Sequence, residues 1–183
     1  MEMQNEMNSQ IKFLALNDLH TNFLNHFNRY QKTTHVFYIE SSELKSKDDF
    51  FEEIWNATKK REITQTLREC LLSGGAVVGA YIENQLVGFA NIENSFFGTK
   101  KEYIELPFIH VSFEHRKHGI GRKLFHKCCE RAKQMGAKKL YIAAHPSIET
   151  QKFYRNVGCT LAKEINKDIL NKEPLDIQLE KIL

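Results

Sequence analysis

The chain has 183 residues, of which 42% are hydrophobic and 27% are charged, and its formal net charge is +3. These values are typical of one soluble globular domain with a full hydrophobic core, so we expect residues 1–183 to form a single domain. No apolar run reaches the roughly 18 residues of a membrane span. Residues 1–10 are polar and acidic and lack the apolar segment of a signal peptide, so we expect a flexible N-terminus, a cytoplasmic location and no membrane partner.

The four cysteines, at positions 70, 128, 129 and 159, form no C-x-x-C pair. This spacing argues against a zinc site and against a disulfide framework, and no metal is expected. Reduced thiols in the cytoplasm are the simplest interpretation.

The first part of the chain predicts strands and helices in alternation. Ile11–Leu16 is typical of a strand, and Asn17 has the residue type of an N-cap for a helix that reaches about Tyr30. His35–Glu40 predicts a short strand or an extended loop. Ser46–Asp49 has acids in the first turn of a second helix, followed by an apolar stripe of Phe50, Phe51, Ile54 and Trp55.

A third helix is indicated by apolar residues at positions i, i+4, i+7 and i+8, which are Ile63, Leu67, Cys70 and Leu71. It ends at Gly74-Gly75. Ala76–Glu83 and Leu86–Ile92 then flank Asn84-Gln85 and predict a hairpin with a short turn.

The second half continues with a strand over Tyr103–Val111 and an amphipathic helix over Gly121–Met135. Leu140–Ala144 is typical of a short buried strand, and Pro146 and Ser147 begin a helix that ends at Gly158. In Pro174–Leu179, apolar and polar residues alternate, as in a strand with one solvent-exposed face.

Arg116-Lys-His-Gly-Ile-Gly121 joins the predicted strand to the basic helix, and this loop is the most informative motif of the chain. Glycines allow backbone N–H groups to approach phosphate oxygens closely, and a helix N-terminus adds unpaired donors. The loop is neither a Walker A sequence nor a three-glycine dinucleotide fingerprint. The alternative is a plain strand-to-helix turn whose glycines serve geometry alone.

Charge is concentrated beside this loop. Between Arg116 and Lys139 lie nine Lys/Arg residues and one acid, Glu130, so this segment carries +8 while the rest carries −5. A basic patch suits a ligand with several phosphates, although a solvated helix face has the same composition. The chain as a whole is not strongly basic, so we expect no nucleic-acid partner.

Three segments together resemble the GNAT-type N-acetyltransferase superfamily. They are V-S-F-E-H-R-K-H-G-I-G-R-K-L-F, then L-Y-I-A-A, then Phe153-Tyr-Arg-Asn-Val-Gly-Cys159, with a cysteine where the family usually has an aromatic residue. The resemblance covers Tyr103 to Cys159. It implies an α/β (α+β) fold with a mixed, mostly antiparallel sheet of six or seven strands, a central parallel pair and helices on both faces.

The resemblance also implies acetyl-CoA as cosubstrate and direct transfer of its acetyl group to a primary amine in a ternary complex. In the family the two central strands splay apart around the pantetheine arm, and Val111 would offer main-chain groups to it. The pyrophosphate would be held by backbone N–H groups of residues 118–123. The full set of expected cofactor-binding residues is Val111, Arg116, Lys117, His118, Gly119, Ile120, Gly121, Arg122, Lys123, Ser147 and Gln151.

Tyr154 matches the tyrosine of the family's F-Y motif near the coenzyme A sulfur, so we expect it to be the general acid. The base is less defined: Glu105 lies where some relatives place one, and His110 alternates with Val111 and so faces the other side of the sheet. A non-catalytic acetyl-CoA-binding module of the same fold is the alternative function.

The acceptor is a small-molecule or peptide amine, and a homodimer is compatible with the family. Between Glu40 and Glu53 lie six acids and two lysines. If this region lined the acceptor site it would favour a cationic amine, whereas a solvated acidic helix start is the alternative interpretation.

Overall fold

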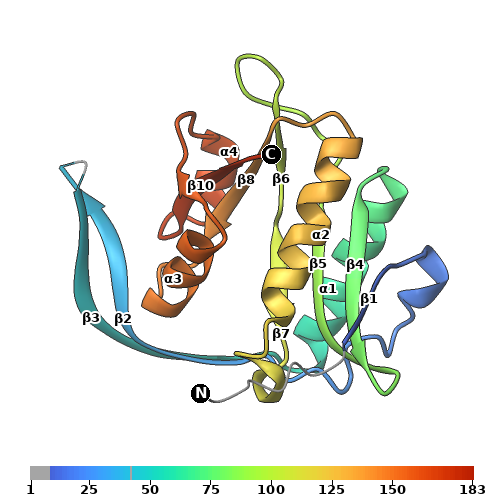
Figure 1. The fold of residues 1–183 in the computed structure, drawn as a ribbon. Helices are drawn as coiled ribbons and strands as arrows, with labels where there is room; N and C mark the ends of the chain where they lie inside the picture. Colours follow the sequence, from blue (N-terminus) through green and yellow to red (C-terminus); the bar gives the residue numbers. More distant parts are fainter. Residues whose placement is uncertain (1–8, 42) are drawn as a thin grey trace, which may run out of the picture.

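A computed structural model describes residues 9–41 and 43–183. Figure 1 shows a layered α/β body from which a long two-stranded ribbon projects. The first sheet consists, in spatial order, of β1 (Gln10–Phe13), β4 (Ala76–Ile82), β5 (Gln85–Ile92) and β7 (Phe108–Val111). The second consists of β6 (Tyr103–Glu105), β8 (Lys139–Ala144), β10 (Ile177–Ile182) and β9 (Thr160–Leu161). The β6–β8 pair is parallel and the pairs of the first sheet are antiparallel, which confirms the predicted mixed, mostly antiparallel architecture.

Helices cover both faces of these sheets. On one face lie α2 (Ile120–Gln134) and α3 (Ile148–Asn156), whose apolar side chains share a core cluster with the inner residues of β4, β5 and β8. On the other face α1 (Ala57–Leu72) packs on β4 and β5, and α4 (Lys167–Lys172) places Ile169 against Tyr103 and Tyr141. The side of the sheet to which a residue points therefore decides which helices it meets.

Local sequence explains several of these boundaries. The side chain of Asn56 accepts a hydrogen bond from the N–H of Lys59 at 2.9 Å and caps α1. Glu83 and Asn84, between β4 and β5, both have positive φ angles (48° and 66°), as the tight turn of a two-residue hairpin requires. The predicted third helix and the predicted hairpin are both confirmed.

The helix predicted from Asn17 to about Tyr30 is wrong. Only a 3-10 turn, η1 (Leu16–Asp18), forms there, followed by i→i+3 hydrogen bonds such as Phe23 N–H to His20 O and Phe27 N–H to Leu24 O. In a series of such turns the chain returns to the same side every three to four residues. The turns therefore bury the same apolar side chains as a helix would. These buried residues are Leu19, Phe23, Leu24 and Phe27.

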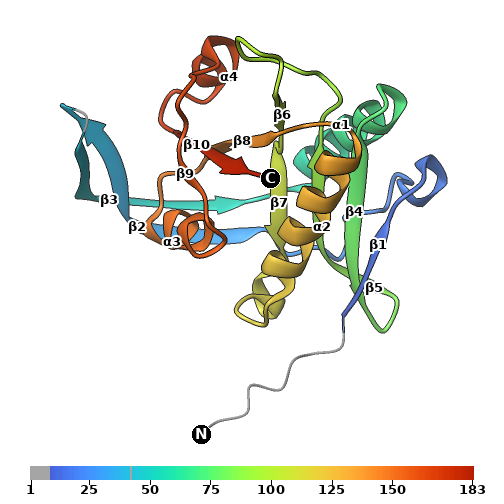
Figure 2. The same ribbon diagram turned by 45° about the horizontal axis from the view of Figure 1, so that its top comes forward.

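The helix predicted to begin at Ser46–Asp49 is also wrong. The segment is a strand, β3 (Glu43–Ile54), paired antiparallel with β2 (Tyr30–Glu40), which extends the predicted strand over His35–Glu40. Phe51 and Trp55 lie four residues apart, which fits a helix face and also alternate positions of a strand. The ribbon formed by these two strands runs from β7 past α3 and then away from the body (Figures 1 and 2).

The predicted single strand Tyr103–Val111 is divided into β6 and β7. Pro107 has no N–H to donate, so ladder pairing cannot continue through it. The last bond to β8 is Leu106 N–H to Tyr141 O at 2.9 Å, and from Phe108 onwards the chain pairs with β5 instead. One stretch of chain thus passes from the second sheet to the first.

Two terminal expectations need comment. Residues 1–10 are expected to be flexible, and most of them lie outside the described residues. Gln10, however, is the first residue of β1 and pairs with Tyr81 of β4. The final strand begins at Ile177 rather than Pro174 and continues to Ile182. No helix among the described residues is long and apolar enough to cross a membrane.

A buried charged network fixes the second sheet on the α4 side. Glu180 on β10 is 1% exposed and accepts hydrogen bonds from Tyr103 Oη at 2.5 Å and from the N–H of Lys163 at 3.0 Å. The ammonium of Lys139 lies 3.7 Å from its other carboxylate oxygen. β6, β8, β10 and the loop after β9 are therefore joined through one carboxylate.

We predict that Glu180→Ala lowers the free energy of unfolding by about 3 kcal/mol, because it leaves the buried Tyr103 hydroxyl and the Lys163 N–H without their acceptor. Lys139 keeps Glu102 as its partner. Urea unfolding followed by circular dichroism measures this. The control is Glu130→Ala, which removes an exposed i,i+3 pair with Lys127 and should cost less than about 0.5 kcal/mol. Equal effects of the two variants would contradict the structural role of Glu180.

Candidate active site

The two strands at the centre of the fold diverge. Parallel pairing of β6 with β8 ends at Glu105↔Tyr141, and β7 pairs only with β5. From Phe108 to Val111 one edge of β7 therefore faces the carboxyl-terminal part of β8 without a ladder between them. The strand ends bordering this gap are Val111 and Ala144, as expected from the sequence.

Main-chain groups of Val111 point into the gap. The N–H of Ser112 donates to Val87 O of β5 at 2.8 Å. Because neighbouring residues of a strand direct their N–H groups to opposite sides, the N–H and C=O of Val111 face away from β5. The carbonyl already accepts a hydrogen bond from Arg116 Nε at 3.1 Å, so the N–H is the group left for a ligand.

The loop from Arg116 to Gly121 has the backbone of a turn that opens a helix. Lys117 and Gly119 have positive φ angles of 65° and 78°, and Gly119 is the N-cap of α2. The first helical hydrogen bond of α2 joins Lys123 N–H to Gly119 O at 3.1 Å, so the amides that precede it have no acceptor within the helix.

The two glycines of the loop serve different purposes. A Cβ at Gly119 would meet no atom within 4 Å, so there is open space beside the helix N-terminus. A Cβ at Gly121 would lie 3.2 Å from Cε2 of Phe153, so this glycine allows α2 to pack closely on α3. The alternative of a plain geometric turn accounts for Gly121, whereas the unfilled space at Gly119 suits a phosphate group.

Tyr154 lies on α3 and is 5% exposed. Its ring packs against Phe125 and Phe153, with ring centroids 6.3 and 5.1 Å away. Burial, and to a smaller extent neighbouring Cys159 and Asp176, raise the pKa of its hydroxyl, so the group stays protonated at neutral pH. Among the described residues, none makes a hydrogen bond with this hydroxyl. It is thus a buried donor available to a ligand.

Ser147 and Gln151 have partners within the protein. The hydroxyl of Ser147 accepts a hydrogen bond from Thr150 N–H at 3.3 Å and caps α3. The amide of Gln151 donates to Ala144 O at 3.2 Å and to His145 O at 2.9 Å. The Gln151 side chain thus attaches α3 to the end of β8, while the Ser147 side chain caps the helix, and both help to position Tyr154.

Glu105 lies on the opposite face of the sheet from Tyr154. It pairs with Tyr141, whose side chain points toward α4. Burial raises the pKa of Glu105 to about 7, and the neighbouring Glu93 carboxylate adds to this effect. At neutral pH this carboxyl can therefore both accept and release a proton.

Sequence reasoning missed a cluster of polar residues that the ribbon brings to the face of the sheet opposite Tyr154. Alternate residues at the base of the ribbon turn inward, and we call them the inner face of the ribbon. They are Arg29, Gln31, Thr33, Phe51, Glu53 and Trp55. The sequence signal for a strand was an alternation: Phe51, Glu53 and Trp55 are partly buried, whereas Glu52 and Ile54 are exposed. When Glu53 is left out, the apolar residues of this segment resemble the stripe of a helix.

Two histidines meet this inner face. His110 on β7 stacks edge-on against Trp55 with ring centroids 4.9 Å apart, on the side away from Val111, as its alternation predicts. Burial, together with the charges of Arg29 and Arg116, holds its pKa well below the usual value, so His110 is neutral. His145, directly after β8, lies 3.6 Å from Glu53 Oε2.

Asp176, just before β10, was also missed. Its position next to Ile177, which pairs with Ala144, places it at the carboxyl end of β8. Its pKa is raised to about 7, mainly by burial and in smaller part by the carboxylates of Glu173 and Glu53.

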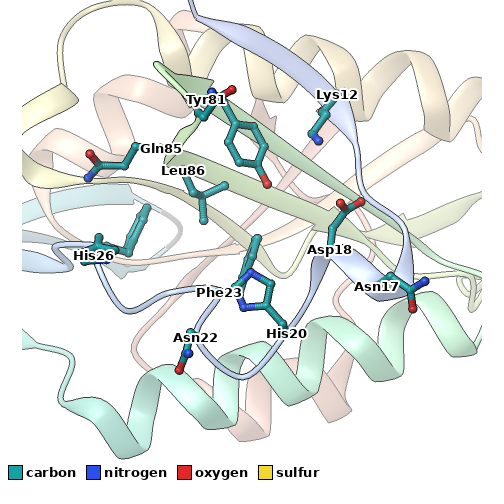
Figure 3. Close-up of a pocket in the computed structure, with 12 residues that line it drawn as sticks. Lys12, Asn17, Asp18, His20, Asn22, Phe23, His26, Tyr81, Gln85 and Leu86 are labelled. Carbon is teal, nitrogen blue, oxygen red and sulfur yellow. The ribbon is translucent and has the colours of Figure 1, made fainter.

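A separate surface hollow lies elsewhere on the molecule (Figure 3). It is lined by residues of β1, the turns that follow it and the β4–β5 turn, including Lys12, Asp18, His20 and Tyr81. None of the loop residues 116–123 and none of the inner-face residues lines it. All four cysteines are free, and no group of residues suited to holding a metal occurs in residues 9–41 and 43–183.

The raised pKa of Glu105 predicts a pH-dependent stability. Because the folded-state pKa lies above the unfolded one, the contribution of Glu105 to stability is greatest below about pH 4.5 and decreases as pH rises toward about 7. Between about pH 5 and pH 8 the free energy of unfolding should decrease less in Glu105→Gln than in the wild type, and the difference should be about 2 kcal/mol. Urea unfolding at both pH values tests this, with exposed Glu130→Gln as control, and parallel pH profiles of wild type and Glu105→Gln would contradict it.

Known structures share this fold. A nourseothricin acetyltransferase aligns with a TM-score of 0.68 and 17% identity over 95% of this chain and 98% of its own. A putative streptothricin acetyltransferase from Bacillus anthracis, in complex with acetyl coenzyme A, aligns with a TM-score of 0.69 and 16% identity over 97% and 99%. The PaiA N-acetyltransferase from Thermoplasma acidophilum, in complex with coenzyme A, aligns with a TM-score of 0.60 and 15% identity over 97% and 100%.

At these identities the structures establish the fold alone, and no curated protein matches the sequence. The sequence model described as "Acetyltransferase (GNAT) family" matches residues 41–159, which is more than half of the chain and includes the ribbon strand β3, the glycine loop and Tyr154. The chain therefore belongs to the acetyltransferase (GNAT) family.

Proposed function

We propose that the protein transfers the acetyl group of acetyl-CoA to a primary amine by direct attack within a ternary complex. One observation carries the proposal: the open space at the N-cap of α2, the gap between β7 and β8, and the unpartnered Tyr154 hydroxyl belong to the same pair of strand ends. A phosphate-binding helix start, a groove for an extended arm and a proton donor are the parts that this reaction requires.

The residues of the loop fit the cosubstrate. The backbone N–H groups of residues 118–123 and the positive end of α2 would hold the pyrophosphate, with Arg116, Lys117 and Arg122 supplying positive charge. Val111 N–H would bind the pantetheine arm or the acetyl carbonyl in the gap. Ser147 and Gln151 would contribute through the position of α3. Acetyl-CoA supplies a thioester, an acetyl group activated for attack by nitrogen.

In the reaction the neutral amine nitrogen forms a bond to the carbonyl carbon, the C–S bond breaks and the sulfur leaves as a thiolate. Tyr154 donates its proton to that sulfur. Glu105, with a pKa near 7 and on the acceptor side, takes the proton that the amine loses, directly or through water. No enzyme nucleophile is needed, which agrees with cysteines whose pKa values are all raised by burial.

The role of Tyr154 separates an enzyme from a non-catalytic acetyl-CoA-binding module. Tyr154→Phe removes the donor and keeps the ring, so turnover at saturating acetyl-CoA should decrease by about 100-fold or more. Calorimetric affinity for acetyl-CoA should change by less than about threefold. Turnover is followed by thiol release, and an unchanged rate in the variant would remove Tyr154 from the mechanism.

Gly119 tests the placement of the pyrophosphate. Because a Cβ there meets no protein atom, Gly119→Ala should cost only the left-handed backbone strain, about 1–2 kcal/mol of stability. Acetyl-CoA affinity should nevertheless decrease by at least about tenfold, since the methyl group occupies the proposed phosphate space. Gly136→Ala, at φ +96° and also free of contacts, is the matched control and should leave affinity unchanged. Normal affinity in Gly119→Ala would place the phosphates elsewhere.

A further inference from the structure

The inner face of the ribbon contains polar groups that the protein itself does not satisfy. Buried side-chain nitrogen and oxygen atoms without a hydrogen-bond partner number seven among the described residues. Four of them belong to this one surface: Nε and Nη1 of Arg29, Oγ1 of Thr33 and Oε2 of Glu53. Each such atom costs about 1–3 kcal/mol, so four of them on one surface indicate that a bound ligand or ordered water completes their hydrogen bonds.

Arg29 is the centre of this cluster. Its side chain is 8% exposed, and its guanidinium lies 5.6 Å from the centre of the Trp55 ring. Glu53 Oε2 is 3.6 Å from Nη2, which is close enough to balance charge but too long for a good hydrogen bond. Burial lowers the pKa of Arg29 to about 10, so the group is still a cation at neutral pH.

The neighbours of Arg29 are held in defined positions. The N–H of Ser147 donates to Nδ1 of His145 at 3.1 Å, which assigns the remaining ring proton to Nε2, on the side of Glu53. Phe51 packs on the same imidazole with ring centroids 5.4 Å apart. The Glu53 carboxylate thus lies between a cation and a histidine N–H, and its side chain is still 41% exposed. Solvent therefore reaches the edge of the cluster at Glu53, and Arg29 lies buried behind it.

The cluster lies on the acceptor side of the reacting strands. Trp55, which contacts Arg29, packs with Phe27 and Phe89 in the core beneath α1. The glycine loop and Tyr154 belong to the opposite face, with α2 and α3. Cosubstrate and inner face thus approach the gap between β7 and β8 from opposite sides, as an acyl donor and the amine that attacks it must.

We propose that Arg29 on the inner face binds a carboxylate of the acceptor, so that the preferred acceptors are amino-acid-like amines carrying a carboxylate. This inference rests on the proposed acetyltransferase function. The planar guanidinium matches a carboxylate in geometry and charge, and Thr33 offers a further hydroxyl donor. Glu53 and Asp176 remain as partners for the ammonium group. A polyamine, which carries only positive charge, would instead face Arg29 and Arg116.

The experiment compares amines with and without a carboxylate. Wild-type protein is given acetyl-CoA and the pairs glycine and methylamine, β-alanine and ethylamine, and L-lysine and cadaverine, and thiol release is measured. In at least one pair we expect kcat/KM to favour the carboxylated amine by about 100-fold, the value of a charged hydrogen-bonded pair. Arg29→Met should remove this preference by lowering kcat/KM for the carboxylated amine alone. Arg61→Met, at an exposed position of α1, is the control and should retain it.

Each other outcome has a distinct meaning. Acetylation that favours the decarboxylated amine in every pair overturns this proposal but leaves the acetyltransferase function intact. If Arg29→Met changes only the preference between succinyl-CoA and acetyl-CoA, then Arg29 binds a carboxylate of the acyl group and not of the acceptor. This result also overturns the proposal. Failure to bind acetyl-CoA in calorimetry overturns both proposals. If Arg29→Met does not fold, the wild-type pairs still decide, because their comparison needs no variant.

Discussion

The break in pairing at Leu106-Pro107 is the constraint on which the rest of the site depends. A residue without an N–H cannot extend the ladder with β8, so the chain turns to β5 and leaves two strand edges facing each other unpaired. Unpaired main-chain groups in the middle of a domain require a partner. The direction of Val111 N–H shows where that partner would lie, and the ends of α2 and α3 converge on the same place.

The two faces of the sheet carry different parts of the candidate site. On one face, Gly121 allows α2 to approach Phe153 of α3, and the capped start of α3 is tied to the end of β8 by Gln151. Tyr154 is therefore held by packing and by hydrogen bonds that other residues supply. On the other face, the ribbon brings charged side chains from positions 29 and 53 to the ends of β7 and β8. The first arrangement is held by packing and leaves the Tyr154 hydroxyl as a free donor, whereas the second retains buried polar atoms without partners in the described part of the chain.

An isolated two-stranded ribbon is only marginally stable in water, so its base needs other contacts. Phe37 N–H donates to Pro146 O at 2.8 Å, Gln31 reaches His145, and Trp55 packs on Phe89. These contacts attach the ribbon to β8, α3 and the α1 core together. The base of the ribbon consequently lies against the ends of β7 and β8, and its inner face borders the candidate site.

The sequence by itself determined the glycine loop, the helix that follows it and the strand Leu140–Ala144, because these depend on local rules: the apolar period of a helix, and glycines where the backbone must turn or approach a ligand. Glu105 and Tyr154 were found through resemblance to the family. Only the tertiary structure decided that residues 43–54 pair as a strand and that residues 19–27 form turns. Apolar spacings of three and four residues fit several local conformations, and the choice is made by partners distant in sequence. The same reason explains why Arg29, Glu53, His145 and Asp176 could not be recognised as one cluster. The first two and the last two lie about 90 residues or more apart in the chain, and only the ribbon and the end of β8 bring them together.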